Sequence, residues 1–166
     1  MSLATHGAIG AIVASKFPGH PILAFCLAFA SHFILDMFPH WDYPMRSVHR
    51  DESNLLNNSM PIGDKNFMTD IFKTGIDFSI GLGASLFLLS SFNDVEILKL
   101  TLIGVIGGVL PDFLQFIYMA IKKEPMISLQ RFHHWIHTKN KMKNQPVLSV
   151  VSQAVLVLVV FYFGNI

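Results

Sequence analysis

The sequence predicts an all-α membrane protein, and its composition and its apolar stretches both support this fold class. Apolar residues make up 52% of the 166 residues, charged residues only 14%, and mean hydropathy is +0.49. Soluble domains usually carry about a quarter charged residues. The length fits one domain, so we expect a single membrane-embedded helical domain over residues 1–166. The alternative is a soluble helical bundle with an unusually apolar core.

We expect a bundle of about five helices together with a short amphipathic helix. A membrane-spanning helix needs ~20 mostly apolar residues, and four stretches approach this length, while a fifth is shorter and closed by Pro18-Gly19. In chain order the predicted elements are the short helix Thr5–Phe17, then Pro21–Phe38, Asp70–Phe92, Ile97–Ile121 with Pro111 inside it, and Pro146–Phe163. The single Cys26 excludes a disulfide framework and a cysteine-based zinc site.

The distribution of basic residues predicts which side of the membrane each connection occupies. With the N-terminus and the long connections 39–67 and 122–145 on one side, only Lys16 and Lys99 lie on the other. The positive-inside rule then places the long connections in the cytoplasm. The net charge of +1 gives no nucleic-acid signature, so we expect membrane lipid as the main partner. The sequence leaves the oligomeric state open.

Metal-capable residues crowd the end of the second predicted helix. His32 and Asp36 are four positions apart and share a helix face, and His40 and Asp42 follow Pro39. Imidazole nitrogen and carboxylate oxygen suit zinc, manganese or iron. Ionisable groups inside a membrane are costly and usually functional. The alternative is a buried His32–Asp36 pair with Asp42 in a turn.

The third and fourth predicted helices resemble the first two, because each pair has a metal-capable residue near both of its ends. The separation of His6 and His40 is 34 residues, and that of Asp77 and Asp112 is 35. We therefore hypothesise an internal repeat of two helical hairpins that gathers these ends together. The alternatives are an interfacial His6, an Asp77 paired with Lys73, and an Asp112 that caps a helix restarted after Pro111.

The segment RFHHWIHTK adds a second group of histidines. On a helix, His133 and His137 lie on one side, a standard spacing for gripping one metal ion, while His134 points outward. The alternative is an interfacial helix with Trp135 at the headgroup level. His20 lies on the opposite side by this topology and is excluded. The roles of His49 and His134 stay open.

Several motifs together resemble a known family. THGAIG, SHFILDMFPHWDYP, GGVLPDF and the later histidines resemble bacterial inner-membrane metal-dependent hydrolases of the LexA-regulated type, and more distantly zinc-dependent phospholipase C. In that family the Leu-Pro-Asp motif usually precedes Ser-His-x-x-x-Asp, and here the order is reversed. The family's His-Arg-Gly-x-Thr-His-Ser signature is missing, so His49-Arg50 or the run 133–137 would have to replace it.

These observations predict a membrane-bound metal-dependent hydrolase that acts at the cytoplasmic face. A metal-activated water would attack a phosphodiester, a phospholipid or a lipid-linked phosphate. Zinc is the expected metal, manganese or iron the alternatives, and one or two ions would fit. The alternative function is a non-catalytic metal-binding, transport or structural membrane protein. We expect Asp112 and His40 to be catalytic, and the predicted metal ligands are His6, His32, Asp36, His40, Asp77, Asp112, His133 and His137.

Overall fold

The protein is described by a computed structural model that covers residues 1–51 and 53–164. In these ranges the chain forms six α-helices and two short 3₁₀ helices and no β-strand. The all-helical prediction is therefore confirmed, while the internal repeat stays a prediction. The α-helices are α1 (Leu3–Ala14), α2 (Pro21–Asp36), α3 (Phe67–Leu88), α4 (Val95–Ile121), α5 (Met126–Ile136) and α6 (Pro146–Gly164), and the 3₁₀ helices are η1 (Leu55–Asn57) and η2 (Ser91–Asn93).

Three of these helices, α3, α4 and α6, are long and apolar enough to cross a membrane. The sequence predicted a fourth span over Pro21–Phe38, but α2 has only 16 residues. At 1.5 Å per residue it covers about 24 Å, less than the ~30 Å of a bilayer core. Pro39 follows closely and cannot extend the helix. By contrast, α4 continues through Pro111 as one 27-residue helix.

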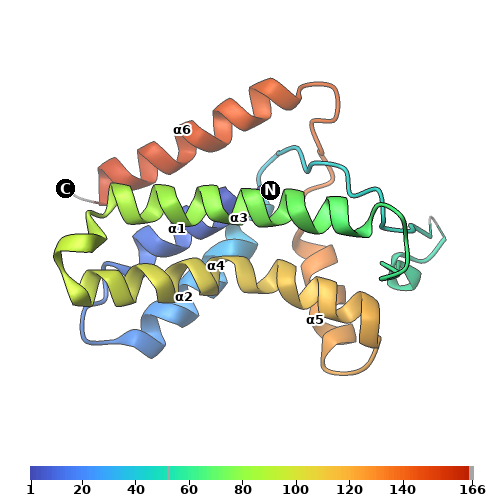
Figure 1. The fold of residues 1–166 in the computed structure, drawn as a ribbon, viewed down its shortest axis with the longest axis horizontal. Helices are drawn as coiled ribbons and strands as arrows, with labels where there is room; N and C mark the ends of the chain where they lie inside the picture. The colour runs from blue at the N-terminus through green and yellow to red at the C-terminus, as the bar shows by residue number, and fades with distance from the viewer. Residues whose placement is uncertain (52, 165–166) are drawn as a thin grey trace.

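Helix α1 occupies the centre of the bundle, where α2, α3, α4 and α6 all contact it (Figure 1). Its contact with α4 is made through glycines. A Cβ on Gly108 would overlap the carbonyl oxygen of His6, and one on Gly10 would overlap that of Gly104. Small residues allow close backbone approach in membrane bundles. This contact brings the start of α1 directly against α4.

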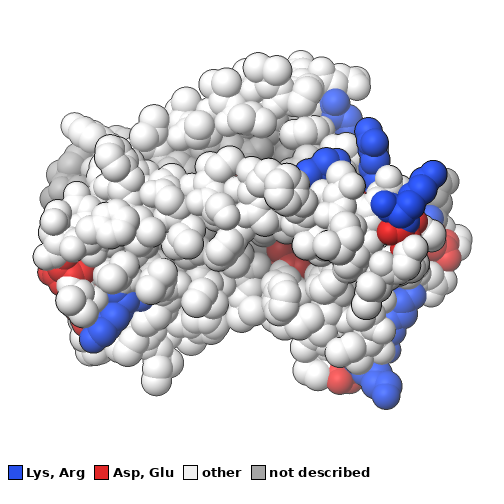
Figure 2. Space-filling model, viewed as in Figure 1, with Lys and Arg blue, Asp and Glu red and all other residues white. Residues whose placement is uncertain are grey.

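The apolar surface and the charged surface are separated along the molecule. In α3 and α6 only 11% of the most apolar window is buried, against 39% in α4. Figure 2 shows white side chains over most of the visible face, with Lys and Arg gathered at the end that carries α5 and the long connections. A smaller charged group lies at the opposite end. The outer faces of α3 and α6 therefore suit contact with lipid.

Candidate metal centre

A cluster of histidines and carboxylates lies where α1, α2, α4 and α5 meet. Helix α1 contributes a residue of its first turn, α2 its last turn, α4 the residue after Pro111, and α5 its C-terminal turn and C-cap. The segment after α2 adds two more side chains. The cluster contains His6, His32, Asp36, His40, Asp42, Asp112, His133 and His137. Seven of the eight predicted ligands are thus brought together, and Asp42 joins them.

The carboxylate of Asp36 is the centre of this cluster. His6 Nε2 lies 3.2 Å from Asp36 Oδ1. On the other oxygen, His32 Nε2 lies 3.2 Å and His133 Nε2 2.8 Å from Oδ2. Only 1% of the Asp36 side chain is exposed. Imidazoles from three helices therefore converge on one buried carboxylate.

The ligand atoms form four overlapping groups, each compact enough to hold an ion. Within each group the candidate atoms all lie within 4.8 Å of one another. The groups are His6–His32–Asp36, His32–Asp112–His133, Asp36–His133–His137 and His40–Asp42–His137. The groups share four residues, which are His32, Asp36, His133 and His137. The buried groups therefore have the composition of a metal site, with enough ligands for two ions.

Backbone carbonyls orient two of the histidines. His32 Nδ1 lies 2.8 Å from the carbonyl oxygen of Gly108, and His40 Nδ1 lies 2.8 Å from that of Phe38. A carbonyl only accepts, so each Nδ1 carries the proton and donates it. In its neutral form each ring then presents the Nε2 lone pair to the cluster. Metal-binding histidines are held in the same way by their outer nitrogen.

Three of the converging atoms have no hydrogen-bond partner among the described residues. They are His6 Nε2, Asp36 Oδ1 and His40 Nε2. His6 Nε2 and His40 Nε2 lie 3.2 Å and 3.8 Å from Asp36 Oδ1. A buried polar atom without a partner costs about 1–3 kcal/mol. A bound cation would satisfy all three atoms, so the cluster could hold a metal ion.

Asp42 sits at the outer edge of the cluster and is strongly anionic. His40 Nε2 lies 3.0 Å from Oδ1, and the amino group of Met1 lies 2.6 Å from the same atom. Lys141 Nζ lies 2.9 Å from Oδ2. Burial alone would raise the pKa of Asp42, but the adjacent His40 imidazole and the two ammonium groups hold it well below its usual range. The spacing His40-Trp41-Asp42 was the sequence signal for this residue.

His137 is in the neutral form that metal binding requires. Burial, together with the positive charge of Lys141, lowers the pKa of its imidazole to about 4. The negative charge of Asp36 acts in the opposite direction and raises the pKa. Below pH 4 the ring would be cationic, and at neutral pH it is uncharged. Neutral imidazole is the form that coordinates a metal.

Asp77 is the one predicted ligand that lies outside the metal-capable groups. Its carboxylate accepts hydrogen bonds from the backbone N–H groups of Leu3, at 2.7 Å, and Ala4, at 3.3 Å. It therefore supplies acceptors to the free donors at the start of α1. Tyr43 lies beside it. Burial raises the pKa of Tyr43 to about 12, and the charges of Asp77 and Asp112 act in the same direction.

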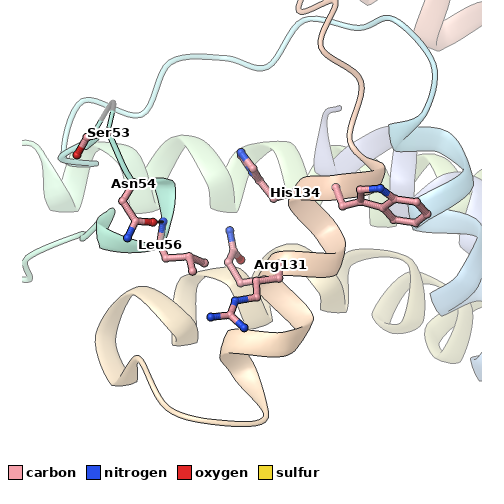
Figure 3. A pocket seen from close by; sticks show the side chains of 7 residues that line it. Ser53, Asn54, Leu56, Arg131 and His134 are labelled. Atoms are coloured by element: carbon pink, nitrogen blue, oxygen red, sulfur yellow. Dashed lines mark hydrogen bonds between the residues drawn. The ribbon is translucent and has the colours of Figure 1, made fainter.

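His134 and His49 lie apart from the cluster. Figure 3 shows His134 and Arg131 beside a cavity between α5 and η1, while His133 of the same helix contacts Asp36. The cavity has a volume of about 390 Å³ and is lined by Ser53, Asn54, Leu56, Gln130, Arg131, His134 and Trp135. His49 Nε2 lies 3.0 Å from Asp64 Oδ2 at the surface, with 59% of its side chain exposed. His20 precedes α2, at the end opposite to Asp36.

The centre is recessed from the ends of the long helices. Asp77 and the start of α1 lie midway along α3, whose first ten residues extend about 15 Å beyond them. Asp112 likewise precedes the last nine residues of α4. The long, charged connections therefore lie further out than the clustered imidazoles.

Comparison with family models, curated proteins and solved structures finds no match to this chain.

Proposed function

We propose that this chain is a membrane-embedded metal-dependent hydrolase that acts on a phosphodiester or phospholipid-type substrate at the cytoplasmic membrane face. The observation that carries the proposal is the set of buried atoms His6 Nε2, Asp36 Oδ1 and His40 Nε2, which make no hydrogen bond within the described part of the chain and in which both nitrogens lie within 3.8 Å of the Asp36 oxygen. The resemblance to inner-membrane metal-dependent hydrolases supports the same function. The cytoplasmic assignment rests on the positive-inside rule.

Zinc is the metal that the donor set favours. Neutral imidazoles and carboxylates are common zinc ligands, and zinc sites with an open position activate water. Asp36, His6, His32 and His133 would hold the metal, since the three imidazoles lie within 3.2 Å of the Asp36 carboxylate. The ions would lower the pKa of bound water to about 7 and stabilise charge on a phosphoryl oxygen.

Asp112 is the residue best placed to handle the proton of the attacking water. Its Oδ1 lies 3.7 Å from His32 Nε2, and 28% of its side chain is exposed. A carboxylate that borders the cluster but remains accessible can accept a proton and release it. Asp36 is buried among imidazoles, so its carboxylate is not accessible for this proton transfer. His40 is expected to act with Asp112 in the reaction, through its Nε2 atom beside Asp42.

The test is to measure metal content and activity on the same purified preparations. Wild-type protein should retain zinc at about one to two ions per chain, and the double variant His6→Ala, Asp36→Ala should lose it. Hydrolysis of a panel of phospholipids and phosphodiesters should require metal and stop on chelation. Unchanged metal content in the double variant would reject the centre. Hydrolysis that is insensitive to chelation would reject the metal-dependent mechanism.

A further inference from the structure

The segment between α5 and α6 borders a second cavity, which is open to solvent and has a basic lining. Its volume is about 570 Å³. Three lysines at alternate positions contribute to the lining, and no acidic residue does among the described part of the chain. The lining residues are Pro39, Lys139, Asn140, Lys141, Met142, Lys143, Asn144 and Gln145. A cavity lined by three lysines and three side-chain amides, those of Asn140, Asn144 and Gln145, suits an anionic oxygen ligand.

Lys141 connects this cavity with the metal-capable cluster. Its Nζ lies 2.9 Å from Asp42 Oδ2, and it lies 2.9 Å and 3.1 Å from the Nδ1 and Nε2 atoms of His137. A hydrogen bond in the ring plane would reach only one nitrogen, so the ammonium lies over the ring face. Lys141 thus holds a positive charge beside two candidate ligands of the outer group.

The same segment is anchored close to the cluster. The backbone N–H of Thr138 donates to the carbonyl oxygen of Asp36 at 2.7 Å. Pro39, which precedes His40, forms one wall of the cavity. The cavity and the cluster are therefore neighbours, and an anion held by the lysines would lie next to the ligand atoms.

We propose that this cavity binds the phosphate group of an anionic ligand and that Lys141 exchanges Asp42 for a phosphate oxygen when the ligand binds. The inference rests on the proposed function and names phosphate as the chemical class that the site receives. About a third of each partner is exposed, 33% of Lys141 and 35% of Asp42. Such partly exposed ion pairs contribute little to stability, so the exchange costs little.

A metal ion in the outer group would favour the same exchange. Asp42 and His137 would then turn their lone pairs to the ion, and the ion would repel the nearby ammonium. Lys141 has a flexible four-carbon stem and can turn into the cavity between Lys139 and Lys143. A phosphate placed there would contact lysine on one side and the metal on the other.

The test is calorimetric titration of inorganic phosphate into the full-length, zinc-loaded protein in detergent. We compare wild type with Lys141→Gln and with the double variant Lys139→Gln, Lys143→Gln, and the matched control is Lys65→Gln, an exposed lysine outside the cavity. Each lost ammonium contact should weaken phosphate binding by about tenfold, in line with a charge-assisted hydrogen bond. The control should bind as wild type does.

Zinc content measured on the same samples separates this inference from the proposed function. Weaker phosphate binding with full zinc content supports the cavity. Wild-type affinity in both lysine variants, with zinc retained, overturns the inference and leaves the metal centre standing. If the wild type holds no zinc and Lys141→Gln still weakens phosphate binding, the hydrolase is rejected and the phosphate-binding cavity is kept.

A competition arm identifies the source of the phosphate. Phosphatidic acid in mixed micelles should displace bound inorganic phosphate if the site receives a lipid headgroup, and diacylglycerol, which lacks the phosphate, should not. Displacement by soluble glycerol phosphate alone would assign the site to a soluble ligand. Displacement by diacylglycerol would show that the acyl chains compete and would overturn the phosphate assignment.

Discussion

His133 Nε2 lies 2.8 Å from Asp36 Oδ2, although the two residues are 97 positions apart in the chain. The backbone N–H of Thr138 donates to the carbonyl oxygen of the same aspartate at 2.7 Å. Two contacts therefore fasten the end of α5 to the end of α2. These contacts hold His133 and the residues that follow α5 against the cluster.

Replacing Asp36 should weaken metal binding. In Asp36→Asn the amide keeps the shape of the side chain but removes the negative charge and one of the two oxygens around which five imidazoles lie within 3.8 Å. We expect at least a tenfold loss of zinc affinity, as for a lost hydrogen-bonded charge partner of a metal site. The measurement is zinc content after dialysis against a weak chelator.

The matched control for this variant is Asp64→Asn. Asp64 also contacts a histidine, His49, at 3.0 Å, but at the surface and outside the cluster. It should keep the wild-type zinc content. Equal zinc loss in both variants would mean that the metal is held nonspecifically by surface groups.

The glycine contact between α1 and α4 should be essential for the site. A Cβ in Gly108→Ala would overlap the carbonyl oxygen of His6, so the helices must separate. Overpacking of this kind typically costs 1–3 kcal/mol. We expect a lower apparent melting temperature together with weaker zinc binding, because His6 moves with α1. Thermal unfolding in detergent and zinc content measure the two effects.

Gly83→Ala is the control for the glycine variant. Gly83 lies in α3 with nothing within 4 Å of a Cβ placed on it. Alanine is a better helix former than glycine, so this variant should unfold at the same or a slightly higher temperature. A similar loss in both variants would show that the effect does not depend on the close contact at Gly108, and it would contradict the packing argument.

The local part of the site could be predicted because helical spacing depends only on the sequence. Four-residue spacing places His32 with Asp36, and Pro39 ends that helix close to His40. The same helical periodicity places the neighbours His133 and His134 on different faces of α5. His133 faces the cluster, and His134 lines the cavity between α5 and η1. For these residues the periodicity alone determines which side chains share a face.

The positions of the other site residues depend on contacts between segments that are far apart in the sequence. The role of Asp77 follows from α1 beginning beside the middle of α3, and no local pattern gives the position at which two helices cross. The spacing of 35 residues to Asp112 suggested a shared cluster, but Asp77 binds the backbone of Leu3 and Ala4 instead. Lys141 likewise meets Asp42 only because the 138–145 segment folds back over α2.

Asp77→Ala should destabilise the fold without removing the metal. The variant loses the two acceptors at the start of α1, a cost of about 0.5–2 kcal/mol for a helix N-terminus. The matched comparison is Asp94→Ala, because Asp94 accepts from the N–H groups of Glu96 and Ile97 at the start of α4. Both should lower the apparent melting temperature and keep zinc. Zinc loss confined to Asp77→Ala would make Asp77 a ligand after all.

Asp112→Asn should separate catalysis from metal binding. Asp112 borders the cluster at 3.7 Å from His32 and is 28% exposed, whereas Asp36 is buried between the imidazoles. An amide cannot accept the proton of an attacking water, and general-base catalysis contributes typically 10²–10⁴-fold. We therefore expect zinc content close to wild type and a fall in kcat of at least about 100-fold. Hydrolysis of a phospholipid substrate and zinc content are measured on one preparation. A variant that keeps its zinc and its kcat would exclude Asp112 as the base, and one that loses zinc in proportion to activity would show that Asp112 acts as a ligand of the metal.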